Sequence, residues 1–145
     1  MYKIILLPLD LTTADATILA HIRPLARLCV AQLHLVHVAD RCAPRYRDQL
    51  NLADSPEIMA DREHLAQRQA ELAADGVSAA IHLAYGDPAT EILRIARELN
   101  CDLIAMATHG HRFMTDVILG TVAEEVRHRT DIPVLLVRAR AEAKL

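Results

Sequence analysis

Aromatic side chains are scarce in this chain of 145 residues, which has three Tyr, one Phe and no Trp. Proteins that bind single-stranded nucleic acids stack the bases on exposed aromatic rings, and this composition offers few such rings. The 16 Lys and Arg residues form no cluster, and 19 Asp and Glu residues outnumber them, which gives a net charge of −3. We therefore expect no nucleic-acid partner.

Long hydrophobic runs are missing too. The longest ones, such as 4–7 and 133–137, fall far short of the ~20 residues that a membrane-spanning helix needs. The chain opens on a strand-like run without the layout of a signal peptide. Its three Cys residues are widely spaced, and no CxxC pair occurs. We expect a cytoplasmic protein with reduced cysteines and no membrane insertion.

Hydrophobic periodicity alternates between that of buried strands and that of helices. Strands are predicted at 2–9, 32–39, 77–85, 102–108 and 133–137. Helices are predicted at 14–31, at 56–74 and after Asp87, whose N-cap position is followed by Pro88. Residues 40–56 form the one long connection. Strands that are apolar on both faces need cover on both sides, so we expect a single α/β domain over 1–145 with a mostly parallel sheet.

Ligands of open α/β sheets bind beyond the carboxyl ends of the strands. This rule points to Asp10, to Val38, to Gly86 and to the segment 108–112. Two interpretations of Asp10 stay open. It is either a cap of the next helix, a role that Thr12 or Thr13 could fill instead, or a carboxylate that accepts hydrogen bonds from ribose hydroxyls.

The segment 108–121 contains the features of a phosphate site. Thr121 and Glu124 have the spacing of a capping box, which predicts that a helix begins at Thr121 with unpaired N–H groups. Such an end binds anions, and Gly110, Arg112 and Gly120 would add two permissive backbone positions and a positive charge. The alternative is that both glycines only end a strand and start a helix, with Arg112 in solvent.

Several other chemistries lack support. Neither G-x-x-x-x-G-K-S/T nor G-x-G-x-x-G occurs, which excludes a Walker-type NTPase and the dinucleotide fingerprint. Residues 108–111 match the T/H-x-G-H signature of nucleotidylyltransferases but follow the wrong strand. His34 and His37 are three residues apart on a strand and point to opposite faces, so they cannot share a metal ion. We expect no metal site and no nucleophilic enzyme.

The order and spacing of these segments resemble the universal stress protein family over essentially the whole chain. The matching segments are 5–10, 33–38, 85–88, 102–110, 120–124, 127–128 and 132–137. ATP-binding members of that family carry G-x2-G-x9-G-S/T. In this register the first glycine is Ala107, followed by Gly110, Gly120 and Thr121. The family's first-strand ending PxDGS is similar to residues 8–12, where Leu11 takes the glycine position.

The resemblance implies a fold, a ligand and an assembly. The fold would be one open five-stranded parallel sheet in the order 3-2-1-4-5 with helices on both faces. The ligand would be ATP or AMP, with or without Mg²⁺, and the protein would form a homodimer through residues 133–138. Asp10 would contact the ribose, and Val38 would offer backbone groups to adenine. The other site residues would be Pro8, Ala107, Gly110, Arg112, Gly120, Thr121 and Val122, with Gly110, Arg112, Gly120 and Thr121 at the phosphates.

The function expected from this resemblance is that of a stress-response sensor or regulator. Two alternatives remain. A slow ATP hydrolase would need a positioned water and a metal-bound phosphate, and no residue clearly serves as its base. A dimerising adaptor without nucleotide is favoured by Ala107 and by the glycine-poor segment 111–113.

Overall fold

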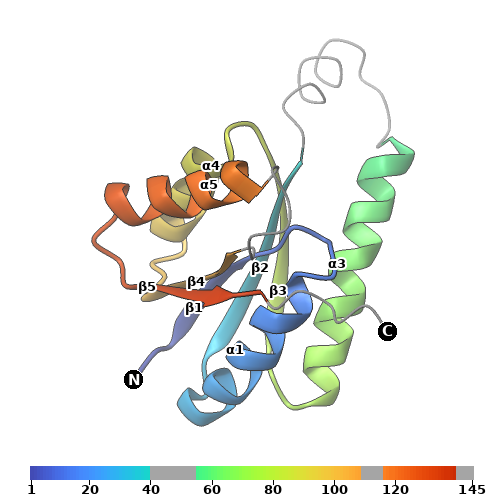
Figure 1. Ribbon diagram of the computed structural model, residues 1–145. Helices are drawn as coiled ribbons and strands as arrows, with labels where there is room; N and C mark the ends of the chain where they lie inside the picture. The colour runs from blue at the N-terminus through green and yellow to red at the C-terminus, as the bar shows by residue number, and fades with distance from the viewer. Residues whose placement is uncertain (40–54, 109–115, 140–145) are drawn as a thin grey trace, which may run out of the picture.

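The computed structural model describes residues 1–39, 55–108 and 116–139, with the backbone alone at 116–120. The described residues form one parallel sheet in the order β3-β2-β1-β4-β5 (Figure 1). Its strands are β1 (Ile4–Pro8), β2 (Gln32–Ala39), β3 (Ala79–Tyr85), β4 (Leu103–Thr108) and β5 (Val134–Arg138). The predicted fold class and strand order are confirmed. The expected connection at 40–56 lies mostly outside the described residues.

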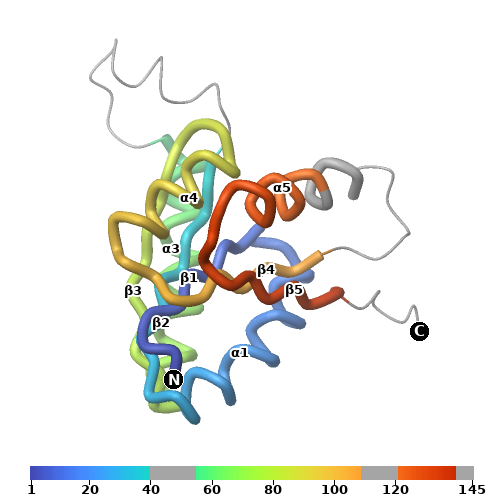
Figure 2. Tube along the Cα trace, turned by 90° about the vertical axis from the view of Figure 1, so that its left-hand side faces the viewer, coloured from blue at the N-terminus to red at the C-terminus, as the bar shows by residue number. Residues whose placement is uncertain are grey.

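Two layers of helices cover the sheet. Helices α1 (Asp15–Cys29) and α3 (Pro56–Ala74) pack on one face, and α4 (Pro88–Glu98) and α5 (Asp116–Arg129) pack on the other. Figure 2 shows α1 and α5 on opposite sides of β4 and β5. The central strand β1 is buried on both faces, because Ile5 and Leu7 belong to the core with α1 and α3 whereas Leu6 belongs to the core with α4 and α5.

Local signals explain where α3 and α4 begin. The side chain of Ser55 accepts a hydrogen bond from the backbone N–H of Ile58 at 3.3 Å, and that of Asp87 accepts one from Thr90 at 3.0 Å. A proline occupies the first position of each helix, where its missing N–H costs nothing. Gly76, with φ 78°, takes the left-handed conformation just after α3.

The prediction that a helix begins at Thr121 is wrong. Helix α5 begins at Asp116, so Thr121 lies in its second turn. The apolar run 117–119 continues the helical register, and Gly120 in a helix interior costs only about 0.5–1 kcal/mol relative to Ala. In a helix with this start the backbone N–H of Thr121 bonds back to residue 117. Thr121 therefore offers no amide to an anion.

Candidate functional site

A cavity of about 190 Å³ opens at the carboxyl ends of β1, β2 and β4. The chain order of the strands reverses there, between β1 and β4, which is where open α/β sheets bind ligands. The walls come from four further elements, namely the loop after β1, α1, α4 and α5. The lining residues are Pro8, Leu9, Asp10, Asp15, Val36, His37, Val38, Pro88, Ile92, Met106, Ala107 and Val122.

Five residues predicted for the site line this cavity together: Pro8, Asp10, Val38, Ala107 and Val122. Thr121 is exposed on α5 and does not line the cavity. Gly120 belongs to the part of α5 that is described by its backbone alone. Gly110 and Arg112 lie outside the described residues.

Asp15 organises the loop that leads from β1 into α1. Its carboxylate oxygens accept hydrogen bonds from the backbone N–H of Asp10 at 3.0 Å and of Leu11 at 2.7 Å. Asp15 is only 5% exposed. Burial raises the pKa of its carboxyl group, the backbone hydrogen bonds oppose this shift, and the charge of Asp10 adds to it. Sequence reasoning missed Asp15, because nothing local shows that the loop turns back over it.

The capping interpretation of Asp10 is wrong. The N-cap of α1 is Ala14, which makes no side-chain capping bond, and the hydroxyl of Thr12 accepts a bond from the Ala14 N–H at 3.3 Å. Leu11 has φ 62°, a left-handed conformation that L-residues rarely adopt. The loop thus takes a glycine-like turn with a leucine in it.

His37 fastens the same loop to the neighbouring strand. Its Nδ1–H donates to the carbonyl oxygen of Leu9 at 2.8 Å, since a carbonyl can only accept. The backbone N–H of Leu9 in turn donates to Val36 at 2.8 Å. The Nε2 of His37 lies 3.8 Å from an oxygen of Asp61 on α3. The cavity wall is therefore held from β2 and approached by a carboxylate from α3.

A pair of histidines lies outside the cavity, one on β2 and the other on β3. The Nδ1 of His34 and the Nε2 of His82 are 2.8 Å apart, and the two rings stack with centroids 5.1 Å apart. Strand register places His82 opposite Val36, so His34 is its diagonal neighbour on the same face. Burial lowers the pKa of both imidazoles, and the proximity of His82 lowers that of His34 further. Among the described residues, no three His, Cys, Asp or Glu side chains could hold a metal ion.

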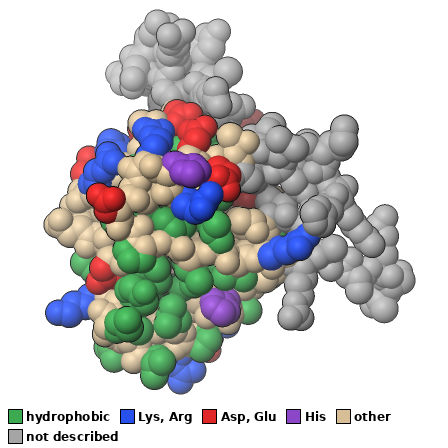
Figure 3. Space-filling model, turned by 60° about the vertical axis from the view of Figure 1, so that its left-hand side comes forward, with side chains coloured by type: hydrophobic (Ala, Val, Ile, Leu, Met, Phe, Trp, Pro, Cys, Tyr) green, Lys and Arg blue, Asp and Glu red, His purple; other side chains and the backbone are tan. Residues whose placement is uncertain are grey.

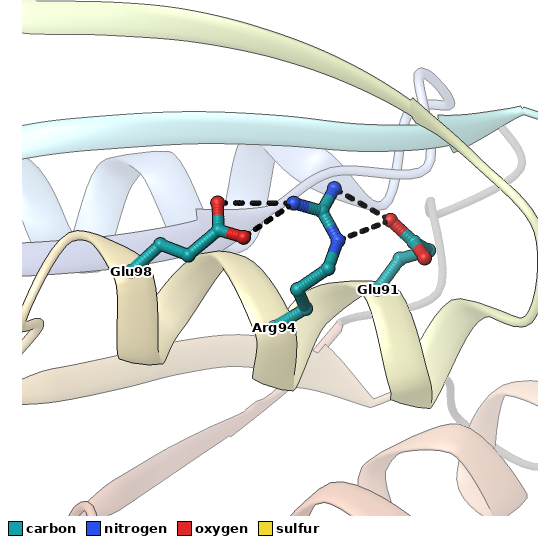
Figure 4. Close-up of polar contacts among 3 residues, drawn as sticks. All are labelled: Glu91, Arg94 and Glu98. Atoms are coloured by element: carbon teal, nitrogen blue, oxygen red, sulfur yellow. Dashed lines mark hydrogen bonds and ion pairs between the residues drawn. The ribbon is translucent and has the colours of Figure 1, made fainter.

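Three charged side chains of α4 pair with one another on the helix surface. Arg94 donates from Nε and Nη2 to Glu91 at 3.0 and 2.7 Å, and from Nη1 to Glu98 at 2.9 and 3.0 Å (Figure 4). Exposed pairs of this kind contribute little to stability. None of the helices in the described part of the chain is long and apolar enough to cross a membrane.

Strand β5 forms one edge of the sheet in the described part of the chain, where it pairs only with β4. Leu136 on this strand is 39% exposed. Figure 3 views the molecule from the side on which β5 lies, and hydrophobic side chains gather in the lower half of that face while most charged ones lie above them. An apolar edge strand is open to pairing with another chain.

A family model, sequence relatives and solved structures all match this chain over most of its length. The family model of the universal stress protein family matches residues 1–138. Universal stress protein MJ0577 of Methanocaldococcus jannaschii is 27% identical over 157 aligned residues, which cover 97% of this chain and 97% of that protein. A solved structure of MJ0577 superposes with a TM-score of 0.80 over 99% of each chain.

Two further solved structures share the fold. A universal stress protein in complex with cAMP is 17% identical, with a TM-score of 0.70 over 96% of this chain and 98% of that one. The universal stress protein from Archaeoglobus fulgidus in complex with dAMP is 19% identical, with a TM-score of 0.69 over 93% of this chain and 97% of that one.

Proposed function

Because this chain belongs to the universal stress protein family, we propose that it is a cytoplasmic stress-response module that binds ATP or AMP and acts as a sensor or regulator. The observation that carries the proposal is the cavity at the reversal of strand order. It combines apolar walls suited to a base with the carboxylate of Asp10, which is suited to sugar hydroxyls. Val38 lines the same cavity from the end of β2. In this proposal its backbone groups bind the edge of adenine.

The cavity is large enough for only part of a nucleotide. Ligand pockets for drug-sized molecules measure roughly 300–1,000 Å³. The cavity of about 190 Å³ suits the base and sugar, and the phosphates extend beyond its described walls. Gly110 and Arg112 are proposed to meet them. Thr121 keeps a place in the proposal through its hydroxyl group, one residue before Val122 in α5.

The proteins with cAMP and dAMP support an adenine ligand. Each was solved with an adenine nucleotide on the fold that this chain shares. Ala107 is the departure that tests how far this support extends, since Ala107 lines the cavity at a position where ATP-binding members of the family carry glycine. A single methyl group leaves the cavity open.

Isothermal titration calorimetry with AMP, ADP and ATP, with and without Mg²⁺, tests the proposal. We expect heat of binding in wild type and none in Ala107→Leu, whose larger side chain fills the cavity. Ala70→Leu is the matched control, because it adds the same atoms on the exposed side of α3 and should bind as wild type does. Thermal melting of both variants verifies that they fold.

Two results would favour the alternatives. Absence of heat with all three nucleotides would contradict nucleotide binding and favour the dimerising adaptor. Release of inorganic phosphate from ATP, abolished in Ala107→Leu, would favour a slow hydrolase instead of a regulator.

We also propose a homodimer through residues 133–138. Support comes from the position of β5 at the sheet edge and from the exposure of Leu136 on it. Pairing of two such edges would cover apolar side chains on both copies.

A further inference from the structure

The carboxylate of Asp15 in the cavity wall is held by two backbone hydrogen bonds. Asp15 is the first residue of α1 and is buried, yet both of its oxygens are engaged by consecutive backbone N–H groups, those of Asp10 and Leu11. Hydrogen bonds to an ionised acceptor are among the strong ones in proteins. Asp15 therefore determines the path of the backbone at the residue that is proposed to contact the sugar.

The conformation of Leu11 explains why the loop needs these hydrogen bonds to Asp15. A leucine at φ 62° is strained, and the loop would relax unless its surroundings held it. The shorter of the two hydrogen bonds, 2.7 Å, is the one that Leu11 donates to Asp15. The carboxylate thus stabilises a turn that glycine would adopt without strain.

Asp15 also adds a second negative charge at one end of the cavity. Asp10 and Asp15 both line it, and their charges interact. Two carboxylates attract hydroxyl donors and repel an anionic oxygen at the same place. A ribose with free 2′ and 3′ hydroxyls suits this end, whereas a sugar with phosphate on its 3′ oxygen does not.

We propose that Asp15 is a positioning and specificity residue that holds Asp10 toward the ribose and selects 5′-nucleotides with a free 2′,3′-diol over 3′,5′-cyclic nucleotides. This inference rests on the proposed nucleotide binding and adds to it the class of nucleotide that the site accepts. It assigns the selection to Asp15 acting with Asp10.

Asp102 provides a matched control at the other end of β1. Its carboxylate accepts hydrogen bonds from two consecutive backbone N–H groups as well, those of Lys3 at 2.8 Å and Ile4 at 3.1 Å. Asp102 does not line the cavity. Replacing either Asp with Asn removes one acceptor oxygen and one charge from a pair of backbone hydrogen bonds at one end of β1, but only Asp15 lines the cavity.

The test measures the affinities of wild type, Asp15→Asn and Asp102→Asn for AMP and for cAMP by calorimetry, together with their melting temperatures. For Asp15→Asn we expect AMP to weaken by about tenfold, the effect of losing one charge-assisted hydrogen bond. cAMP should weaken much less, so that the preference for AMP falls. Asp102→Asn should lower the melting temperature and leave both affinities unchanged.

A double variant separates the positioning effect of Asp15 from the effect of its charge. It also keeps the test valid if Asp15→Asn folds poorly. Leu11→Gly relieves the strain, so in the Asp15→Asn background it should restore stability and part of the AMP affinity, while the preference for AMP stays low. An unchanged preference for AMP in both Asp15 variants overturns this inference alone. A wild type that binds neither nucleotide overturns the proposed function and this inference together.

Discussion

Replacement of Val30 by glycine should stabilise the protein. Val30 follows α1 with φ 52° and ψ 43°, the left-handed conformation, and its N–H donates to Arg27 at 3.2 Å while that of Ala31 donates to Ala26 at 2.9 Å. This is the usual helix ending in which glycine is preferred. The valine side chain is 90% exposed, so its removal sacrifices almost no buried surface.

The magnitude follows from two opposing effects. The left-handed conformation costs an L-residue roughly 1–2 kcal/mol. Glycine makes the unfolded chain more flexible, which costs about 0.4–1 kcal/mol. The difference is a gain of about 0.5–1 kcal/mol, equivalent to an increase in melting temperature of about 1–4 °C for a chain of this size.

Differential scanning calorimetry of wild type, Val30→Gly and Val30→Ala provides the measurement. Alanine keeps the Cβ atom that causes most of the strain, so Val30→Ala should gain less than Val30→Gly. A melting temperature of Val30→Gly at or below that of wild type would refute the reasoning. It would also weaken the argument about Leu11, which has a similar conformation.

Three further predictions concern pH, phosphate binding and assembly. Burial lowers the pKa of His34 and His82 below the ordinary value of 6.5, so near that pH the unfolded chain binds protons that the folded chain does not. The free energy of unfolding should therefore fall as pH drops below about 6.5, and it should fall less in His82→Gln. Urea unfolding measures this free energy at each pH, and the same dependence on pH in both proteins would contradict the idea. Arg112→Ala should weaken ATP by about ten- to a hundredfold and adenosine hardly at all, because its contribution is charge, and equal losses in calorimetry would exclude that role. Leu136→Lys should convert the proposed dimer to monomer in light scattering, and a dimer of unchanged stability would place the interface on another surface.

Local chemistry explains why much of the fold could be predicted. The bounds of β2 at 32–39 and of α3 at 56–74 match the prediction, since β2 is rich in Leu and Val and Ser55, Pro56 and Gly76 mark the ends of α3. The start of α4 at Pro88 follows from Asp87 in the same way. These signals act within a few residues and do not depend on the rest of the molecule.

The start of α5 shows the limit of such signals. Thr121 and Glu124 have the spacing of a helix cap, but capping patterns also occur by chance inside helices. The apolar residues before Gly120 extend the helix back to Asp116, which propensity alone does not predict.

By itself the sequence determined the alternation of elements, the parallel sheet and the placement of Asp10 and Val38 at the carboxyl ends of strands, because apolar periodicity and topology rules suffice for these. The strand order and the place of Ala107 in the site followed from the family resemblance instead. Only the tertiary structure decided that Asp15 turns its carboxylate onto the loop after β1 and that His34 contacts His82. The first contact depends on the strained turn at Leu11, and the second on the register between two strands 48 residues apart in sequence. Both arise from how the chain is folded back on itself, which no pattern within a single segment encodes.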